Sequence, residues 1–119
     1  LFRSARFSDF PALYAASSAA AYMSFFEGFG IPILEAMCSG TVVLTSNCSS
    51  MPEVGGDAVL YADPRRSDEI AAQLLRLLTD DVLRADLLSR SRQRIQRFTA
   101  EKIGDDFYRL YVELYKGGV

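Results

Sequence analysis

The stretch Glu27-Gly-Phe-Gly-Ile-Pro-Ile-Leu-Glu35 decides the fold of this 119-residue chain, because it joins a strand pattern to a helix pattern. The uncharged residues 20–25 that precede it are typical of a buried strand. After a glycine-rich turn, Pro32 suits the first turn of a helix, and Gly40 suits the position that ends one. The segment therefore predicts a strand, a tight turn and a short helix over about residues 32–39.

Further strands and helices are predicted on either side of this segment. The predicted elements are a helix over about 8–17 that buries Leu13 and Tyr14, strands over 42–45 and 58–61, one helical turn over 52–54, helices over about 67–78 and 81–97, and a last helix with an apolar stripe from Ile103 to Leu114. Strands that alternate with helices predict an α/β fold, a Rossmann-like parallel sheet in three layers with a helical part from about residue 67. Three to four strands are few for such a sheet, so one edge is expected to be open and to favour self-association.

Composition places the chain among globular proteins and excludes several classes of function. Hydrophobic residues make up 50% and charged residues 24%. The net charge of −2 gives no basic excess for binding nucleic acid. The chain has no histidine, the commonest general base and metal ligand, and two cysteines alone cannot form a zinc site. No metal is expected, and Cys38 and Cys48 are expected to be reduced thiols in a cytoplasmic protein.

The charges are unevenly distributed along the chain. No Lys or Arg lies between Arg6 and Arg65, and residues 1–64 hold two bases against six acids. Residues 65–119 hold eleven bases against nine acids. The uncharged run over residues 10–26 is 17 residues long, at the lower limit for a membrane span, but its prolines, serines and alanines argue against one.

The turn after the first predicted strand has the properties of a ligand site. Backbone N–H groups at Gly30 and Ile31 would form an anion site at the start of the helix, at the carboxyl edge of the sheet where ligands bind in open α/β folds. Carboxylates accept hydrogen bonds from hydroxyl groups, so Glu27 and Glu35 fit a ligand that carries hydroxyls as well as phosphate. A sugar nucleotide offers both. The alternative is that Glu27 is a solvated turn residue and that Glu35 only favours the helix N-terminus.

Two consecutive segments carry a family resemblance. EGFGIPILEAMCSG, residues 27–40, and TVVLTSNCSSMPEVGGDAVLYADP, residues 41–64, resemble the retaining group 1 glycosyltransferases (family 4) of GT-B fold. The resemblance covers nearly the whole chain, is dense over Tyr22–Pro64, and continues more loosely to Arg97–Glu101.

The resemblance implies transfer of a sugar from a nucleotide-diphosphate donor to an acceptor with retention of the anomeric configuration. It makes Glu27 the catalytic residue, which contacts hydroxyls of the transferred sugar, and it assigns the ribose hydroxyls to Glu35. The other donor-binding residues that it implies are Gly28, Phe29, Gly30 and Ile31. No cofactor or metal is implied. The acceptor would be a glycan or a lipid-linked sugar, bound by an N-terminal domain.

The chain also departs from the family pattern. Val42 stands where the family usually has Pro, and Ala100 where it often has Trp. The family's Arg and Lys that bind the diphosphate lie upstream of Leu1, which agrees with the lack of bases before Arg65. The chain therefore resembles a single partial domain over residues 1–119, the C-terminal part of a donor-binding domain. It is expected to be inactive alone, and to reach the inner membrane only peripherally, through the missing domain.

Other interpretations stay open at this stage. The chain could be a non-catalytic nucleotide-sugar-binding or interaction module of the same fold, whereas a Rossmann oxidoreductase is disfavoured because no G-x-G-x-x-G follows a strand. The Ser46–Ser50 loop could face the donor or form a plain polar turn, and Phe7 and Ser8 could lie near the base. The remaining expectations are a solvated helix face rather than a phosphate patch for Arg90, Arg92, Arg94 and Arg97, a core position for Cys38, and a role in its own loop for Glu53.

Overall fold

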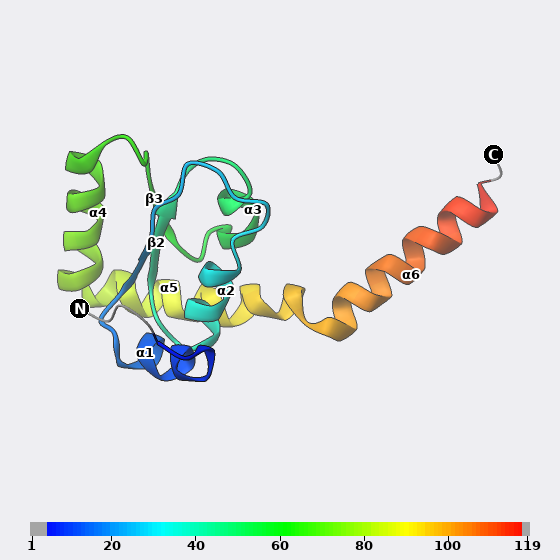
Figure 1. The fold of residues 1–119 in the computed structure, drawn as a ribbon, viewed down its shortest axis with the longest axis horizontal. Coiled ribbons are helices and arrows are strands. Elements are labelled where there is room, and N and C mark those ends of the chain that lie inside the picture. The colour runs from blue at the N-terminus through cyan, green and yellow to red at the C-terminus, as the bar shows by residue number, and fades with distance from the viewer. Residues whose placement is uncertain (1–4, 118–119) are drawn as a thin grey trace.

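The computed structural model describes residues 5–117, which form three strands and a larger set of helices (Figure 1). The elements in chain order are the 3-10 helix η1 (Phe7–Asp9), α1 (Phe10–Ala16), β1 (Ala20–Tyr22), α2 (Ile31–Cys38), β2 (Val43–Ser46), α3 (Met51–Gly55), β3 (Leu60–Ala62), α4 (Ser67–Thr79), α5 (Asp81–Arg94), the 3-10 helix η2 (Ile95–Phe98) and α6 (Ala100–Lys116).

The three strands form one parallel sheet in the order β1-β2-β3. Leu44 of β2 pairs with Ala21 on one side and with Leu60 on the other. The central strand β2 is buried along its whole length, which explains its uninterrupted apolar and small polar sequence. The predicted parallel α/β sheet is confirmed. Strands β1 and β3 are its two edges, and self-association through an edge stays a prediction.

Helices cover both faces of the sheet, as the alternating pattern predicts. In Figure 1 the strands stand between α4 on one side and α2 and α3 on the other. Successive residues of β2 point to opposite faces, so Val43 packs with α2 and α3, and Leu44 packs with α4 and α5. Ile33 and Met51 are fully buried in the first core, and Leu77 is fully buried in the second. The expected three-layer arrangement is present.

Several local predictions are wrong. Strand β1 ends at Tyr22 instead of continuing to residue 25, because the Ser24 hydroxyl donates to the Phe26 carbonyl and the chain turns away from β2. Phe25 is therefore 63% exposed. Leu13, predicted to be buried, is 37% exposed. Cys38, expected in the core, is exposed at the last turn of α2.

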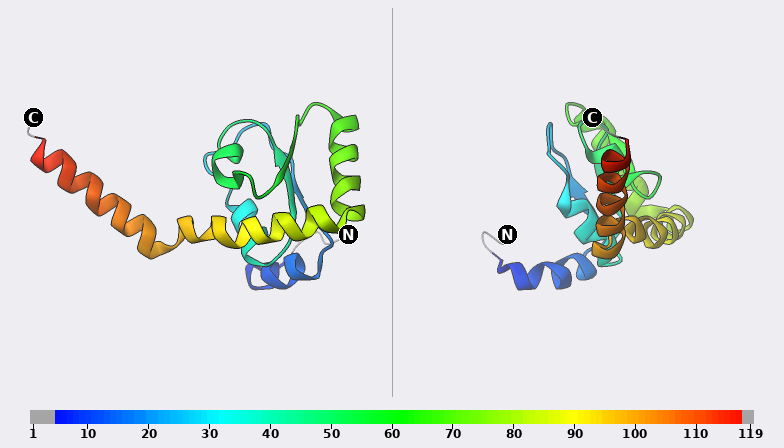
Figure 2. Two further views of the ribbon diagram at one scale, coloured as in Figure 1. Left: turned by 180° about the vertical axis from the view of Figure 1, so that it is seen from behind. Right: turned by 90° about the vertical axis from the view of Figure 1, so that its right-hand side faces the viewer.

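The C-terminal helices depart from the body of the molecule. The single helix predicted over 81–97 ends at Arg94, where the 3-10 turn η2 begins. Thr99 then starts α6, and its side chain accepts a hydrogen bond from the Lys102 N–H at 3.2 Å. Helix α6 projects away from the sheet in Figure 1 and in the left view of Figure 2, and it contains no buried residue. None of the helices in residues 5–117 has the length and apolar character needed to span a membrane.

Candidate functional site

The glycine loop, residues 27–30, connects β1 to α2 at the carboxyl edge of the sheet. Gly30 precedes the first residue of α2 with a left-handed backbone, φ +98° and ψ 44°. A Cβ on Gly30 would lie 3.2 Å from Ile33 Cδ1, so glycine is needed there both for its conformation and for its size. Gly28 has open space around it, which leaves its backbone accessible from solvent.

Two serines of the loop between β2 and α3 hold the backbone of the glycine loop. The Ser49 hydroxyl accepts a hydrogen bond from the Glu27 N–H at 3.2 Å and donates to the Glu27 carbonyl at 2.8 Å. The Ser50 hydroxyl lies 3.0 Å from the Glu27 carbonyl and 2.9 Å from the Phe29 carbonyl. Sequence patterns could not assign these hydroxyls, because their partners lie more than twenty positions away along the chain.

The Glu27 carboxylate is held by a tyrosine at the end of β1. The Tyr22 phenol donates a hydrogen bond of 2.6 Å to Glu27 Oε1. This bond, and to a smaller extent the nearby Ser24 hydroxyl, lower the pKa of Glu27, because both stabilise the carboxylate form. The same bond, with some burial, raises the pKa of Tyr22 to about 12. Glu27 is therefore ionised and its phenolic partner protonated at neutral pH.

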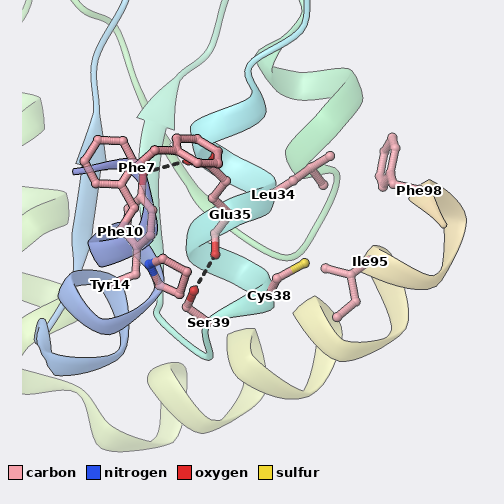
Figure 3. A pocket seen from close by; sticks show the side chains of 10 residues that line it. Phe7, Phe10, Tyr14, Leu34, Glu35, Cys38, Ser39, Ile95 and Phe98 are labelled. Atoms are coloured by element: carbon pink, nitrogen blue, oxygen red, sulfur yellow. Dashed lines mark hydrogen bonds between the residues drawn. The ribbon is translucent and has the colours of Figure 1, made fainter. Parts of the chain in front are cut away.

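Glu35 lies one turn further along α2 and lines a pocket of about 460 Å³ (Figure 3). The Tyr14 phenol of α1 lies 3.4 Å from Glu35 Oε2, and burial followed by the Glu35 charge raises the pKa of that phenol. The other lining residues are mostly apolar, namely Phe7, Phe10, Pro11, Leu34, Cys38, Ser39, Ile95 and Phe98. Phe7 thus lies in the same pocket as Glu35, whereas Ser8 does not line it.

The fold also brings a cation to this edge of the sheet, which the sequence pattern did not reveal. Arg65 follows the carboxyl end of β3, and its guanidinium carbon lies 5.7 Å from the ring centroid of Phe25. Phe25 stands two residues before Glu27. The site therefore has a positive charge nearby, although no Lys or Arg lies between Arg6 and Arg65 in the sequence. Forty residues separate Arg65 from Phe25, so only the parallel sheet brings them together.

The arginines of α5 are largely engaged by other protein groups. Arg90 forms ion pairs with Asp86 at 2.6 Å and with Asp57 at 3.8 Å. Arg94 donates to the carbonyl of Val54 at 3.1 Å and to that of Glu53, which satisfies the last carbonyls of α3. The Glu53 carbonyl thus joins α3 to α5, and the role expected for Glu53 in its own loop stays a prediction. Arg92 and Arg97 are exposed, as expected for a solvated helix face, but this expectation is wrong for Arg94, which is half-buried against α3.

No group of three or more metal-ligating side chains gathers within residues 5–117. Both cysteines are free thiols.

Comparisons with known proteins agree with this geometry. The family model described as "Glycosyl transferases group 1" matches residues 4–94. The O-antigen chain mannosyltransferase B of Escherichia coli is 48% identical over 93 residues, which cover 78% of this chain and 24% of that protein. The phosphatidyl-myo-inositol mannosyltransferase of Mycolicibacterium smegmatis is 33% identical over 95 residues, which cover 78% of this chain and 25% of that protein.

A solved structure shares the fold. The sucrose-phosphate synthase of Thermosynechococcus elongatus superposes with a TM-score of 0.75 and 27% identity, over 89% of this chain and 27% of that chain. The present chain thus spans about a quarter of the length of the relatives that it matches.

Proposed function

This chain belongs to the group 1 glycosyltransferases, and we propose that it forms the part of such an enzyme that binds a nucleotide-diphosphate sugar. The observation that carries the proposal is the pairing of two carboxylates with two phenols around one loop. Glu27 and Glu35 flank the glycine loop and the first turn of α2, and each accepts a hydrogen bond from a tyrosine. Both carboxylates keep further lone pairs for ligand hydroxyls.

The loop between the glutamates suits a diphosphate. In the described part of the chain, the backbone N–H groups of Phe29, Gly30 and Ile31 donate to no other protein group. They stand at the N-terminus of α2, where the helix dipole favours an anion. Arg65 would add a positive charge from the end of β3. The diphosphate would therefore bind between the two glutamates.

The pocket beside Glu35 suits the nucleoside. Its carboxylate would accept hydrogen bonds from the ribose hydroxyls, and the rings of Phe7 and Phe10 offer apolar faces for a base. Glu27 would then bind hydroxyls of the transferred sugar and position that sugar for transfer with retention. The mannosyltransferase names of the relatives support mannose as this sugar.

The matched segment covers only about a quarter of each relative, which supports separate domains for donor and acceptor within the enzyme. We propose that a separate domain binds the acceptor, a glycan or a lipid-linked sugar, and that the 119-residue chain alone does not transfer sugar. Donor-dependent glycosylation of added glycans by the purified chain would contradict this part of the proposal.

Calorimetric titration of the chain with GDP-mannose, UDP-glucose and ADP-glucose tests donor binding. One of these donors is expected to bind, and Glu35→Ala is expected to weaken its binding about tenfold or more, the usual effect of losing hydrogen bonds to a charged group. Glu101→Ala, which removes an exposed carboxylate from α6, is the matched control. Equal donor affinity in Glu35→Ala and in the unchanged chain would contradict the ribose assignment.

A further inference from the structure

We infer that Tyr22 and Ser49 are positioning residues for Glu27, so that the loop after β2 and the end of β1 together fix the carboxylate that faces the transferred sugar. This inference rests on the proposed function, because it concerns the same site. It adds two residues that neither the sequence motif nor the family match assigns to that site.

The first observation is the conformation of Ser49. Its φ is +55°, the one positive value at a residue other than glycine within residues 5–117. This region costs a residue with a Cβ conformational energy, and such strain persists only where surrounding contacts hold it. At Ser49 the contacts that hold it are the two hydrogen bonds to Glu27.

The second observation is that one hydroxyl both donates to Glu27 and accepts from it. Ser49 Oγ accepts from the Glu27 N–H and donates to the Glu27 carbonyl, so both backbone groups of that residue are engaged by one side chain. An unengaged peptide at this position would be free to rotate, and the carboxylate would move with it. The serine therefore fixes the backbone from which the Glu27 side chain extends.

The third observation is the bond from Tyr22 to the carboxylate itself. At 2.6 Å it is a short, charge-assisted hydrogen bond to Oε1. The backbone of Tyr22 is fixed in turn, because Thr45 of β2 donates to its carbonyl at 2.8 Å. Because Tyr22 belongs to β1, the sheet holds its phenol in place. The phenol fixes one orientation of the Glu27 side chain and leaves the second carboxylate oxygen for a ligand.

The loop between β2 and α3, which carries Ser49, is held in place at both ends, as a positioning role requires. Met51, two residues later, is fully buried, and its Cγ lies 3.8 Å from where a Cβ on Gly30 would stand. The Asn47 N–H donates to the Ala62 carbonyl at 3.2 Å, which ties the start of the same loop to β3. Both ends of the loop are therefore anchored, and Ser49 can hold Glu27 in place.

The test uses the chain itself, with nuclear magnetic resonance of its glutamate carboxylates and of the Glu27 amide. Tyr22→Phe is expected to raise the pKa of Glu27 towards the ordinary glutamate value, because the largest stabiliser of the carboxylate is lost. Ser49→Gly, which suits a positive φ but lacks the hydroxyl, is expected to speed hydrogen exchange at the Glu27 amide. An unchanged pKa in Tyr22→Phe together with unchanged exchange in Ser49→Gly would overturn the inference.

Matched controls are available for both variants. Tyr61→Phe removes a phenol that donates to the Gly56 carbonyl at 2.8 Å, and Ser17→Ala removes a hydroxyl that donates to the Tyr14 carbonyl at 2.7 Å. Neither control is expected to change the Glu27 signals. A change in the Glu27 pKa of the same size in Tyr61→Phe would show a general structural effect and would also overturn the inference.

A binding comparison separates this inference from the proposed function. The affinity for a nucleotide sugar is divided by the affinity for the matching nucleoside diphosphate, which isolates the contribution of the sugar. Tyr22→Phe and Ser49→Gly are expected to lower this ratio about tenfold while leaving the diphosphate affinity unchanged. If the unchanged chain binds neither ligand, the proposed function fails, and the resonance measurements still decide whether the two residues position Glu27.

Discussion

The ring of Phe98 meets the ring of Phe29 edge-on, with centroids 5.9 Å apart and planes at 83°. This contact joins the turn before α6 to the glycine loop. The guanidinium of Arg94 lies 5.5 Å from the Phe98 ring centroid, on the same turn, while its nitrogens bind the carbonyls at the end of α3. Phe98 and Arg94 thus join the glycine loop and the end of α3 to the turn before α6.

Replacing Phe98 by alanine is expected to destabilise the chain by about 1–2 kcal/mol. The value is below the 3–5 kcal/mol of a fully buried phenylalanine, because the ring is only half-buried, yet it includes an aromatic pair and a cation–π contact. Thermal unfolding followed by circular dichroism measures the loss. Tyr115→Ala on α6 removes a ring that is 90% exposed and is expected to have no effect. Equal melting temperatures for both variants would contradict this role of Phe98.

Gly55→Ala is expected to destabilise the chain by about 1–3 kcal/mol, through overpacking. A Cβ on Gly55 would stand 2.5 Å from Val59 Cγ2 and 2.6 Å from the Tyr61 hydroxyl, both in well-packed surroundings. Gly104→Ala is the matched control, since nothing lies within 4 Å of a Cβ there and alanine favours the helix by about 1 kcal/mol. Denaturant titration should therefore show that Gly55→Ala lowers the free energy of unfolding and that Gly104→Ala raises it. An unchanged free energy of unfolding in Gly55→Ala would contradict the packing described.

Leu77→Ala is expected to cost about 2–5 kcal/mol of the free energy of unfolding. The side chain is fully buried between α4 and the sheet, with Leu44 and Leu87 among its neighbours in that core. Leu75→Ala, on the same helix at 62% exposure, should cost at most about 0.5 kcal/mol of the free energy of unfolding. If urea unfolding gave similar losses for the two variants, α4 would not pack on this face as described.

Alkaline pH is expected to destabilise the fold through its tyrosines. The pKa of Tyr22 and that of Tyr61 are both raised to about 12, by the Glu27 bond in the first case and by burial in the second. A phenol with a raised pKa in the folded state contributes its stability in full below pH 10, and the contribution is lost as the pH rises to about 12. The melting temperature should fall across this window.

Melting temperatures of tyrosine variants check the assignment of that fall. Tyr22→Phe and Tyr61→Phe should each make the decline in melting temperature between pH 10 and 12 shallower, since one raised pKa is removed in each variant. Tyr115→Phe, on an exposed part of α6, should leave the slope unchanged.

Elements that local chemistry specifies could be predicted from the sequence. Helix α2 was placed within one residue at each end, because Pro32 and Gly40 mark its ends, and Gly40 does adopt the expected left-handed conformation. The parallel sheet followed from the alternation of strands and helices. The length of β1 was wrong, because its sequence stays uncharged as far as Phe26 and does not reveal the turn in which Ser24 donates to the Phe26 carbonyl.

The candidate site was predictable only in part. The roles of Glu27 and Glu35 came from a motif and stay predictions, whereas their hydrogen-bond partners depend on tertiary structure. The Ser46–Ser50 loop was one of two open interpretations, but the contact of Ser49 with Glu27 and the position of Arg65 depend on tertiary structure. A tyrosine at the end of a strand and five residues before a glutamate is the one pattern that could have been noticed.

Helix α6 has a consequence for the cooperativity of unfolding. Its 17 residues bury no side chain, and isolated helices of this length are only marginally stable in water. Its amides should therefore exchange hydrogen by local opening, well before those of β2, whose residues are all buried. Far-ultraviolet and near-ultraviolet dichroism should report different transitions, so a two-state fit would average a fraying helix with a cooperative α/β core.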